Sequence, residues 1–446
     1  MRTFKLGGVH PADQKISQDA KIERLPIPKM VYISMGQHLG APAEPCVAVG
    51  DKVKVGTLIA NPTGFVSAPI HSSVSGTVKE ISMVKDLAGR ASKAIVIEVE
   101  GDEWEESIDK SPDIVREVKL TGKEIVERIK NCGVVGLGGA TFPTNVKLSP
   151  PPTAKPTCVI INGAECEPYL TSDYRVMLEY GEQLLIGGEI LMKALGVNKC
   201  YVGIEENKPK AISYLKELTS KNHPNIEIVT LKKKYPQGGE KQLIDAIIRK
   251  RVPSGGLPVE TGAVVQNVGT AFAVYEAVQK NKPLFEGILT VTGNCSEAQR
   301  NFFHRVGTPL SFIADYCGGI PSNAAKIISG GPMMGKAIAN MDAPTLKGTS
   351  SILYLAEDQT KRAEEGNCIR CSKCVSACPM GLEPYLLNKL GRANMMEELE
   401  AHYVFDCIEC GCCSFTCPAH IPLLDTIRQS KAAVMKIMRA RSTAKK

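Results

Sequence analysis

Hydrophobic and polar positions follow four different patterns along the chain. In residues 30–100, apolar and polar positions alternate in short runs broken by Gly and Pro, such as VYISMG and AIVIEVEGD, which predicts a small all-β unit. Residues 115–285 alternate amphipathic stretches such as GKEIVERIKN with apolar runs such as TCVIING, which predicts an α/β layer with parallel strands. Strand character returns in residues 286–345, and a cysteine-rich segment with a basic helical end follows from about residue 355. We therefore expect a multidomain α/β and α+β protein with domains at 1–114, 115–285, 286–354 and 355–446.

Composition narrows the class of protein. A chain of 446 residues, 43% of them hydrophobic, is long enough for several cores. The net charge of +7 is small for this length, and no basic stripe is interleaved with aromatics, which argues against nucleic acid as a partner. No run approaches the roughly 18 apolar residues of a transmembrane helix, and the first residues lack the apolar core of a signal peptide. We expect a protein of the cytoplasm without a transmembrane segment of its own.

Nine of the sixteen cysteines lie between Cys368 and Cys417. In a long chain without an export signal, such clustering indicates metal ligation rather than disulfides. Two runs have the spacing C-x2-C-x2-C-x3-C-P, which is typical of a ferredoxin with two [4Fe–4S] clusters. The fourth cysteine of each run starts a helix that leads away from that run and ligates the other cluster. The predicted ligands are Cys368, Cys371, Cys374 and Cys417 for the first cluster, and Cys407, Cys410, Cys413 and Cys378 for the second.

The alternative for these cysteines is a pair of zinc sites, each closed by CxxC pairs. Two complete four-cysteine runs, each followed by Pro, favour the clusters. Cys412 lies between ligands and is expected to be a bystander, and the seven scattered cysteines are expected to be buried thiols. The clusters carry single electrons and make no bonds, so no catalytic side chain is predicted. His71 and His304 are interpreted as ordinary histidines.

Glycines are dense in residues 133–150, GVVGLGGATFPTNVKLSP, directly after a predicted helix. Glycines allow backbone N–H groups to approach a phosphate closely, and Lys147 adds a point charge. The strand VIING then ends in polar residues at 162–167, and ligands bind at the carboxyl ends of strands in open α/β sheets. Two further polar patches follow, YPQGGE at 235–240 and QNVGT at 266–270. Together these segments favour a site for a phosphate-bearing ligand.

The same four segments resemble the motifs GRGGAGFPTGLKW, NADExEPG, YxxGEE and NNVET of the flavoprotein subunit of respiratory complex I. The resemblance implies that the central domain binds FMN and NADH. For FMN it implies Gly136, Gly138, Gly139, Lys147, Asn162, Glu165, Gln266, Asn267 and Thr270, with Tyr235 and Gly238 lining the flavin. For NADH it implies Phe142, Glu167 and Glu240. The chain departs from those motifs at Leu137, Thr141, Ala164 and Gln266.

The order of segments over nearly the full length resembles the RnfC family. That resemblance implies an N-terminal barrel-sandwich hybrid, which is similar to biotinyl and lipoyl carriers but lacks a modifiable lysine in the hairpin and is interpreted as a structural adaptor. It further implies a Rossmann-like FMN domain, a β-grasp domain of the SLBB type, and a C-terminal helical domain like a two-cluster ferredoxin. The implied protein is the peripheral NADH-oxidising subunit of the Rnf complex, on the cytoplasmic face of the cell membrane. Its implied partners are the membrane-embedded subunits, a ferredoxin-like RnfB-type subunit and, indirectly, ferredoxin.

The activity implied by this resemblance is electron input. NADH delivers a hydride to FMN, and the flavin releases single electrons through the clusters, coupled to Na+ or H+ translocation. Two alternatives stay open: a soluble flavin and iron–sulfur donor to another reductase, and a conduit without NADH activity, which Ala164 favours. The basic tail from Ile421 to Lys446 is expected to be either a solvated helix end or a docking element for an acidic partner or an anionic membrane face.

Overall fold

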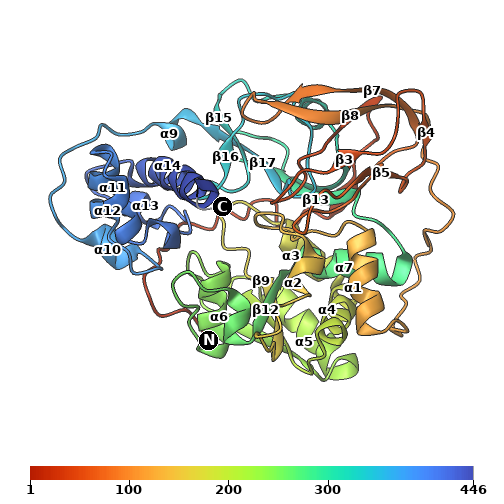
Figure 1. Ribbon diagram of the computed structural model, residues 1–446, viewed down its shortest axis with the longest axis horizontal. Helices are drawn as coiled ribbons and strands as arrows, with labels where there is room; N and C mark the ends of the chain where they lie inside the picture. The colour runs from red at the N-terminus through yellow and green to blue at the C-terminus, as the bar shows by residue number, and fades with distance from the viewer. Residues whose placement is uncertain (445–446) are drawn as a thin grey trace.

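The computed structural model describes residues 1–444, and its N-terminal domain is the expected all-β unit (Figure 1). One sheet has the strand order β2-β8-β7-β4 and the other the order β3-β5-β6. The strands are β2 (Met30–Ser34), β3 (Glu44–Pro45), β4 (Lys52–Val53), β5 (Leu58–Asn61), β6 (Ile70–His71), β7 (Gly76–Lys85) and β8 (Ala91–Val99). Alternate residues such as Val31, Ile33, Ile95 and Ile97 are fully buried in one core, so the period-two pattern produces the barrel sandwich.

The central domain is built on a parallel sheet with the order β11-β10-β9-β12. Its strands are β9 (Cys158–Gly163), β10 (Cys200–Glu205), β11 (Ile226–Leu231) and β12 (Ala263–Asn267). Successive residues of β9 enter different cores: Val159 and Ile161 pack with helix residues on one face, and Ile160 packs on the other. Both faces are therefore covered, as the continuous apolar runs in the sequence predict.

Helices on both faces complete the central domain. They are α1 (Gly122–Asn131), α2 (Thr144–Lys147), α3 (Ser172–Glu179), α4 (Gly181–Leu195), α5 (Pro209–Asn222), α6 (Glu240–Ile248), the 3-10 helix η1 (Pro258–Thr261) and α7 (Val268–Lys280). Local signals set their ends. Thr121 and Glu124 form a capping box at the start of α1, and Gly196 ends α4 with a φ of +66°. Leu184 and Val274 are fully buried, which anchors α4 and α7 in the same core.

The sheet of the third domain has the order β1-β14-β13-β17-β15-β16, in which β1 (Ile22–Arg24) comes from the start of the chain. Its elements are β13 (Glu286–Thr292), β14 (Arg300–Arg305), α8 (Leu310–Tyr316), β15 (Ala324–Ser329), β16 (Lys336–Ala337) and β17 (Ser351–Ala356). β13 pairs antiparallel with β14 and parallel with β17, and α8 packs on this sheet through Leu310 and Ile313. This is the expected β-grasp arrangement. β17 runs to Ala356, past the expected boundary at residue 354.

Residues 1–24 form a strap that does not join the barrel sandwich, although the sequence places it within the same expected domain, 1–114. Arg2 pairs with β11, and Val9 pairs with Tyr235 of the central domain. The Gly8 N–H donates to the Ala377 carbonyl at 2.9 Å in the C-terminal domain. Strand β1 (Ile22–Arg24) then extends the β-grasp sheet beside β14. The strap therefore contacts three domains, because its partners are made by residues far along the chain.

The C-terminal domain is helical, as expected. Its elements are α9 (Glu357–Thr360), α10 (Lys373–Ala377), α11 (Pro384–Arg392), α12 (Met396–Ala401), η2 (Val404–Asp406), α13 (Cys412–Phe415) and α14 (Leu423–Ala444). Leu387, Leu399 and Ile427 join α11, α12 and α14 in one core. In residues 1–444, no helix combines the length and apolar character needed to cross a membrane.

The basic tail folds as α14, and several of its cations have partners within the chain. Arg428 and Lys431 lie 3.2 and 3.1 Å from the Glu409 carboxylate. Arg441 lies 3.0 Å from Glu400. Neither alternative given for the tail includes these pairs, which fasten this part of α14 to the rest of the C-terminal domain. Residues 445–446 lie outside the described part of the chain.

Candidate functional site

The carboxyl ends of β9 and the edge strand β12 lie side by side in the parallel sheet. The chain goes from β9 to β10 and β11 on one side, while β12 lies on the other, so the strand order reverses at this point. Asn162 at the end of β9 donates from Nδ2 to the Gly238 carbonyl at 2.8 Å. Asn267 at the end of β12 caps α7, accepting from the Gly269 N–H at 2.7 Å. Ligands of open α/β sheets bind in the crevice at such a reversal.

The glycine loop lies against the start of α7. The Gly136 N–H donates to the Phe142 carbonyl at 2.8 Å, which closes the loop on itself. The Leu137 N–H donates to Thr270 Oγ1 at 2.8 Å, and Thr270 is fully buried. The sequence places Leu137 and Thr270 more than 130 positions apart, and the structure brings them together.

Gly138 and Gly139 of this loop differ in whether a side chain would fit at their positions. Gly138 has a φ of +75°, and a Cβ there would lie 2.7 Å from Asn267 Nδ2, so a side chain is excluded by both strain and contact. A Cβ on Gly139 would meet nothing within 4 Å. The loop therefore packs through Gly138 and leaves open space at Gly139, which is the side on which a ligand can approach.

Charged and polar groups line the same strand ends. Lys147 Nζ donates to Glu240 Oε1 at 2.7 Å and to the Val265 carbonyl at 2.9 Å. Both side chains of this ion pair are partly exposed, at 27% and 35%. Gln266 is buried, and its Nε2 has no hydrogen-bond partner among the described residues. An open glycine cradle, a lysine at its edge and an unpaired amide donor fit a phosphate-bearing, polar cofactor such as FMN.

Asp173 is a further residue of this site that the sequence does not single out. It lies at the start of α3, and its Oδ2 accepts from Asn267 Nδ2 at 2.7 Å. Burial raises the pKa of Asp173 to about 7, and the nearby Glu165 carboxylate contributes to the increase. The available signal is its position at the start of the helix that follows the polar segment 162–167. Its partner Asn267 could not be inferred from spacing.

Glu165 lies in a buried network beneath the site. Its Oε1 accepts from the Asp173 N–H at 2.7 Å, at the N-terminus of α3, where a carboxylate is favoured by the helix dipole. Lys15 of the strap lies 3.9 Å from Glu165 Oε2 and donates to the carbonyls of Glu165, Glu167 and Leu170 at 2.7–2.8 Å. The strap therefore fixes the turn that carries both glutamates.

Glu167 and Tyr235 face the neighbouring domains. Glu167 accepts from the backbone N–H groups of Met333 and Met334 at 3.0 and 2.9 Å, in the loop between β15 and β16. Burial raises the pKa of Glu167, and these two N–H donors oppose the increase. The Tyr235 hydroxyl donates to the Cys410 carbonyl at 2.9 Å. The roles that the sequence assigns to Glu167 and Tyr235 stay predictions, and both residues occupy a junction between three domains.

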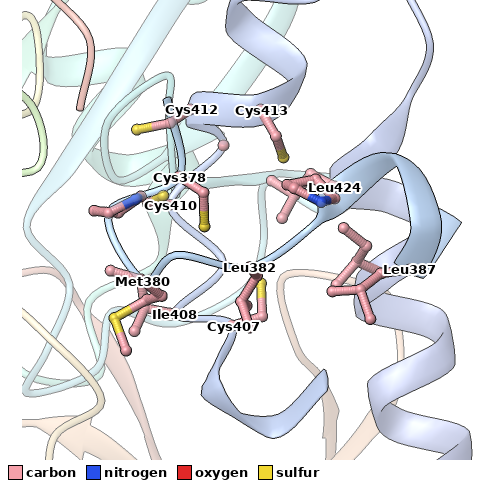
Figure 2. A pocket seen from close by; sticks show the side chains of 14 residues that line it. Cys378, Met380, Leu382, Leu387, Cys407, Ile408, Cys410, Cys412, Cys413 and Leu424 are labelled. Atoms are coloured by element: carbon pink, nitrogen blue, oxygen red, sulfur yellow. The ribbon is translucent and has the colours of Figure 1, made fainter. Parts of the chain in front are cut away.

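The second predicted ligand set lines one cavity in the C-terminal domain (Figure 2). Cys378, from the first run, lies beside Cys407, Cys410 and Cys413, as the crossed pattern predicts. Cys412 also lines this cavity, where its thiol hydrogen-bonds with Cys410 and lies 3.9 Å from the Tyr235 carbonyl. Leu382, Leu387, Ile408 and Leu424 complete an apolar wall. Burial raises the pKa of Cys407 to about 11, so cluster binding displaces a proton from this thiol.

The first ligand set is more open. Cys374 packs in one small core with Cys417, again as the crossed pattern predicts. Cys368 and Cys371 are exposed, in a segment that has neither helix nor strand from residue 361 to 372. Within residues 1–444, no group of three or more His, Cys, Asp or Glu side chains is already arranged to hold a metal ion. Cys374 and Cys417 are thus neighbours in the fold, and the assignment of the four ligands to this site stays a prediction.

Comparisons with known proteins agree with this geometry. Residues 3–102 match the RnfC barrel sandwich hybrid domain, residues 129–276 the Nuo51 FMN-binding domain, and residues 364–421 the 4Fe-4S dicluster domain. One subunit of the proton-translocating ferredoxin:NAD(+) oxidoreductase complex of Clostridium ljungdahlii is 46% identical over 90% of this chain and 87% of the relative. The chain belongs to the RnfC family.

Other RnfC relatives extend over similar lengths. The corresponding subunit of the Na(+)-translocating ferredoxin:NAD(+) oxidoreductase complex of Acetobacterium woodii is 42% identical over 97% of each chain. That of the ion-translocating oxidoreductase complex of Rhodobacter capsulatus is 38% identical over 89% of this chain and 77% of the relative. The expected family, the FMN-binding domain and the two-cluster domain are thus confirmed, and these RnfC relatives are named as parts of larger complexes.

Proposed function

We propose that this chain is the electron-input subunit of an ion-translocating ferredoxin:NAD+ oxidoreductase complex. It oxidises NADH at FMN and passes single electrons through two [4Fe–4S] clusters toward partner subunits and ferredoxin. The observation that carries this proposal is the gathering of the glycine loop, Asn162, Asn267 and the Lys147–Glu240 pair at one sheet edge in an RnfC chain. The names of the relatives in Clostridium ljungdahlii and Acetobacterium woodii support the reaction class.

The residues of the sheet edge have distinct roles in this proposal. FMN, when bound, supplies the chemistry that takes up two electrons and releases them singly. The loop at Gly138 and Gly139 offers backbone N–H groups and open space to the phosphate, and Lys147 balances its charge. Gln266 and Asn162 offer amide groups, which donate and accept hydrogen bonds. Thr270 acts indirectly, because its hydroxyl accepts from the loop.

Glu240 determines which nicotinamide cofactor, NADH or NADPH, the site prefers. Its carboxylate is partly exposed and held 2.7 Å from Lys147 Nζ. A carboxylate accepts hydrogen bonds from both hydroxyls of a ribose, and it repels a 2′-phosphate. The site is therefore selective for NADH over NADPH. Phe142, which is partly exposed beside the glycine loop, supplies an apolar surface for the nicotinamide.

The two clusters act in a fixed order. The second set, Cys378 with Cys407, Cys410 and Cys413, lies next to the central domain through Tyr235. The first set includes the exposed Cys368 and Cys371. Electrons from the flavin therefore enter at the second cluster and leave from the first. The recipients are the membrane-embedded and ferredoxin-like RnfB-type subunits, which place this chain on the cytoplasmic face of the membrane, with Na+ or H+ as the coupling ion.

Anaerobic reconstitution with FMN and iron, followed by titration with NADH and then NADPH, tests the proposal. NADH is expected to bleach the flavin and then reduce both clusters, and NADPH to do so only at much higher concentration. A protein that binds FMN but shows no cluster reduction by NADH is instead a conduit. A protein that is reduced by NADH but does not bind membranes carrying the other subunits is a soluble donor.

A further inference from the structure

Three domains and the strap meet around Glu167 and Tyr235. We propose that these two residues are positioning residues that seat the second cluster against the flavin domain, and that Glu167 does not bind the nicotinamide. The inference rests on the proposed function in one respect: it requires that the second cluster is present. It concerns contacts that are made by the chain itself.

Both oxygens of Glu167 are already engaged. Oε2 accepts from the Met333 N–H at 3.0 Å, and Oε1 accepts from the Met334 N–H at 2.9 Å. The Tyr235 hydroxyl lies 3.5 Å from Oε1. Two converging N–H donors match a carboxylate and hold it in place. The Gly331 loop and Tyr235 enclose this carboxylate, so a ribose hydroxyl could reach its remaining acceptor positions only if the loop moved aside. Moving the loop would break the N–H hydrogen bonds to Glu167, which is costly in a buried setting.

The loop that binds Glu167 is shaped for this contact. A Cβ on Gly331 would clash with Glu167 Oε2, so glycine is required for the loop to approach the carboxylate. The Gly335 N–H donates to the Gly331 carbonyl at 2.8 Å, which closes the loop. The loop belongs to the β-grasp domain, and Glu167 belongs to the flavin domain. Their contact therefore fixes one domain on the other.

The same loop also lies on the cysteine segment. A Cβ on Gly411 would lie 3.1 Å from the Met333 carbonyl, and Met333 packs in one apolar core with Cys410 and Cys412. Tyr235 reaches this segment from the flavin domain, because its hydroxyl donates to the Cys410 carbonyl. The segment around Cys410 is thus held from two sides by residues that Glu167 connects.

Tyr235 is itself rigidly placed. It is 1% exposed, and its backbone exchanges two hydrogen bonds of 2.8 Å with Val9 of the strap. The N–H of Gly8, the neighbouring strap residue, bonds the carbonyl of Ala377, directly before Cys378. The strap therefore ties Tyr235 and the fourth ligand of the second cluster to each other. Neither contact involves a residue of the first cluster.

Charge and hydrogen bonds near an iron–sulfur cluster set its reduction potential. Glu167 places a carboxylate beside Cys410, which makes the addition of an electron to the second cluster less favourable. The Tyr235 hydroxyl donates to the backbone carbonyl of Cys410, so the positive end of its O–H dipole faces the cluster segment and has the opposite effect. Glu167→Gln should therefore shift the potential of the second cluster to more positive values, and Tyr235→Phe should shift it to more negative values.

Mediated redox titrations of the holoprotein, followed by electron paramagnetic resonance, measure both potentials. Glu167→Gln and Tyr235→Phe are expected to shift the second-cluster signal in opposite directions and to leave the first-cluster signal unchanged. Limited proteolysis is expected to cut the Glu167→Gln protein faster within residues 330–335. The dissociation constant of NADH is expected to stay within twofold of that of the unchanged protein.

A matched pair in the same domain controls for general effects. The Tyr385 hydroxyl donates to Glu383 Oε1 at 3.1 Å, near Cys374 of the first set. Glu383→Gln and Tyr385→Phe are expected to leave the second-cluster potential unchanged. If Glu167→Gln does not fold, Gly331→Ala keeps the carboxylate and displaces the loop, and it should alter the second-cluster signal and the proteolysis rate.

The outcomes separate this inference from the proposed function. A tenfold or greater loss of NADH affinity in Glu167→Gln overturns the inference, because Glu167 would then be a nicotinamide ligand. Unchanged second-cluster potentials in both variants overturn it as well. The titrations use a chemical reductant, so they remain informative if NADH fails to reduce the wild-type protein, a result that would reject the proposed function alone.

Discussion

The first cysteine run lies in an exposed segment, whereas the second lies beneath contacts from three domains. Ile369, between two ligands of the first run, is 68% exposed, while Cys410 and Cys413 of the second are 7% and 8% exposed. The two runs have the same cysteine spacing. The spacing therefore determines that each run can bind a [4Fe–4S] cluster, but it does not determine the role of each cluster. The surroundings decide the role. We call the site of Cys378, Cys407, Cys410 and Cys413 the inner site and the site of Cys368, Cys371, Cys374 and Cys417 the outer site.

The largest expected effect comes from removing one ligand of each site. Cys410→Ala and Cys374→Ala should each lower the iron content from about eight atoms to about four. In Cys410→Ala the remaining outer cluster should no longer be reduced by NADH, although dithionite still reduces it. In Cys374→Ala the inner cluster should still be reduced by NADH. Iron analysis and paramagnetic resonance measure these results. Cys412→Ala is the control and should keep both clusters, and NADH reduction of the outer cluster in Cys410→Ala would break the inner-to-outer order.

Gly139→Val tests whether FMN binds at the glycine loop, upstream of the inner and outer clusters. A Cβ at this position meets no protein atom within 4 Å, so the fold should tolerate the substitution. The added side chain fills the space beside the loop, and FMN binding should weaken at least tenfold, equivalent to about 1.4 kcal/mol. Flavin fluorescence and iron analysis measure the result: flavin is lost, iron is retained, and both clusters respond only to dithionite. Retention of FMN would place the phosphate elsewhere.

Glu240→Gln should have a smaller and more selective effect. The variant loses a carboxylate that accepts hydrogen bonds, so NADH binding should weaken about tenfold while FMN binding stays within twofold. Because Glu240 also pairs with Lys147, FMN retention must be measured in the same protein. Glu217→Gln, on the exposed face of α5 beside Lys221, is a matched control. Equal loss of FMN and NADH would show that Glu240 supports Lys147 instead.

Asp173→Asn should change stability with a defined pH dependence. The folded-state pKa of about 7 lies above the ordinary value of 3.8, so the protonated carboxyl is favoured in the folded protein. The contribution of the protonated Asp173 carboxyl to the free energy of unfolding is complete below about pH 4. This contribution, up to about 4 kcal/mol, is lost as the pH rises through about 7. The amide of Asn mimics the protonated form. Thermal unfolding of wild type and variant at pH 5 and pH 8 should show the variant gaining relative stability at the higher pH, and a pH-independent difference would contradict the assignment.

The smallest effect is expected from the tail. Removing residues 435–446 deletes Arg441 and its exposed ion pairs with Glu397 and Glu400, which together contribute on the order of 1 kcal/mol or less. Both clusters should remain, because no predicted ligand lies in α14. Assembly with partner subunits should weaken and become more sensitive to salt if the tail also docks. Co-sedimentation with membranes at low and high salt measures this, and unchanged assembly at both salt concentrations would favour a solvated helix end that does not dock.

Local patterns explain why much of the fold is predictable from sequence. The period-two strands of the barrel sandwich, the parallel sheet and the helical cysteine domain all follow from residues close in the chain. The cysteine runs are local too, and the structure brings Cys378 to the second run and Cys417 to Cys374. The resemblance to a flavoprotein of respiratory complex I adds the ordered residues of the glycine loop and the strand ends.

Long-range contacts explain what sequence cannot supply. Glu167 meets Met333 and Tyr235 meets Cys410 across separations of 166 and 175 residues, and no spacing rule links them. Asp173 becomes part of the site only through Asn267, which lies 94 residues away. Sequence order groups the strap with the barrel sandwich because the strap directly precedes it. Its hydrogen bonds are made to β-strands and loops whose positions depend on the whole fold.

The strap has a consequence for biosynthesis. Residues 1–24 are synthesised before their partners at Thr230, Phe303 and Ala377, which lie much later in the chain. Contacts of such large sequence separation form slowly, and domains generally fold as units during synthesis. The newly made strap must therefore wait, unpaired and open to proteases, until the central, β-grasp and cysteine domains have folded. Docking of the strap is therefore expected to follow the folding of these three domains.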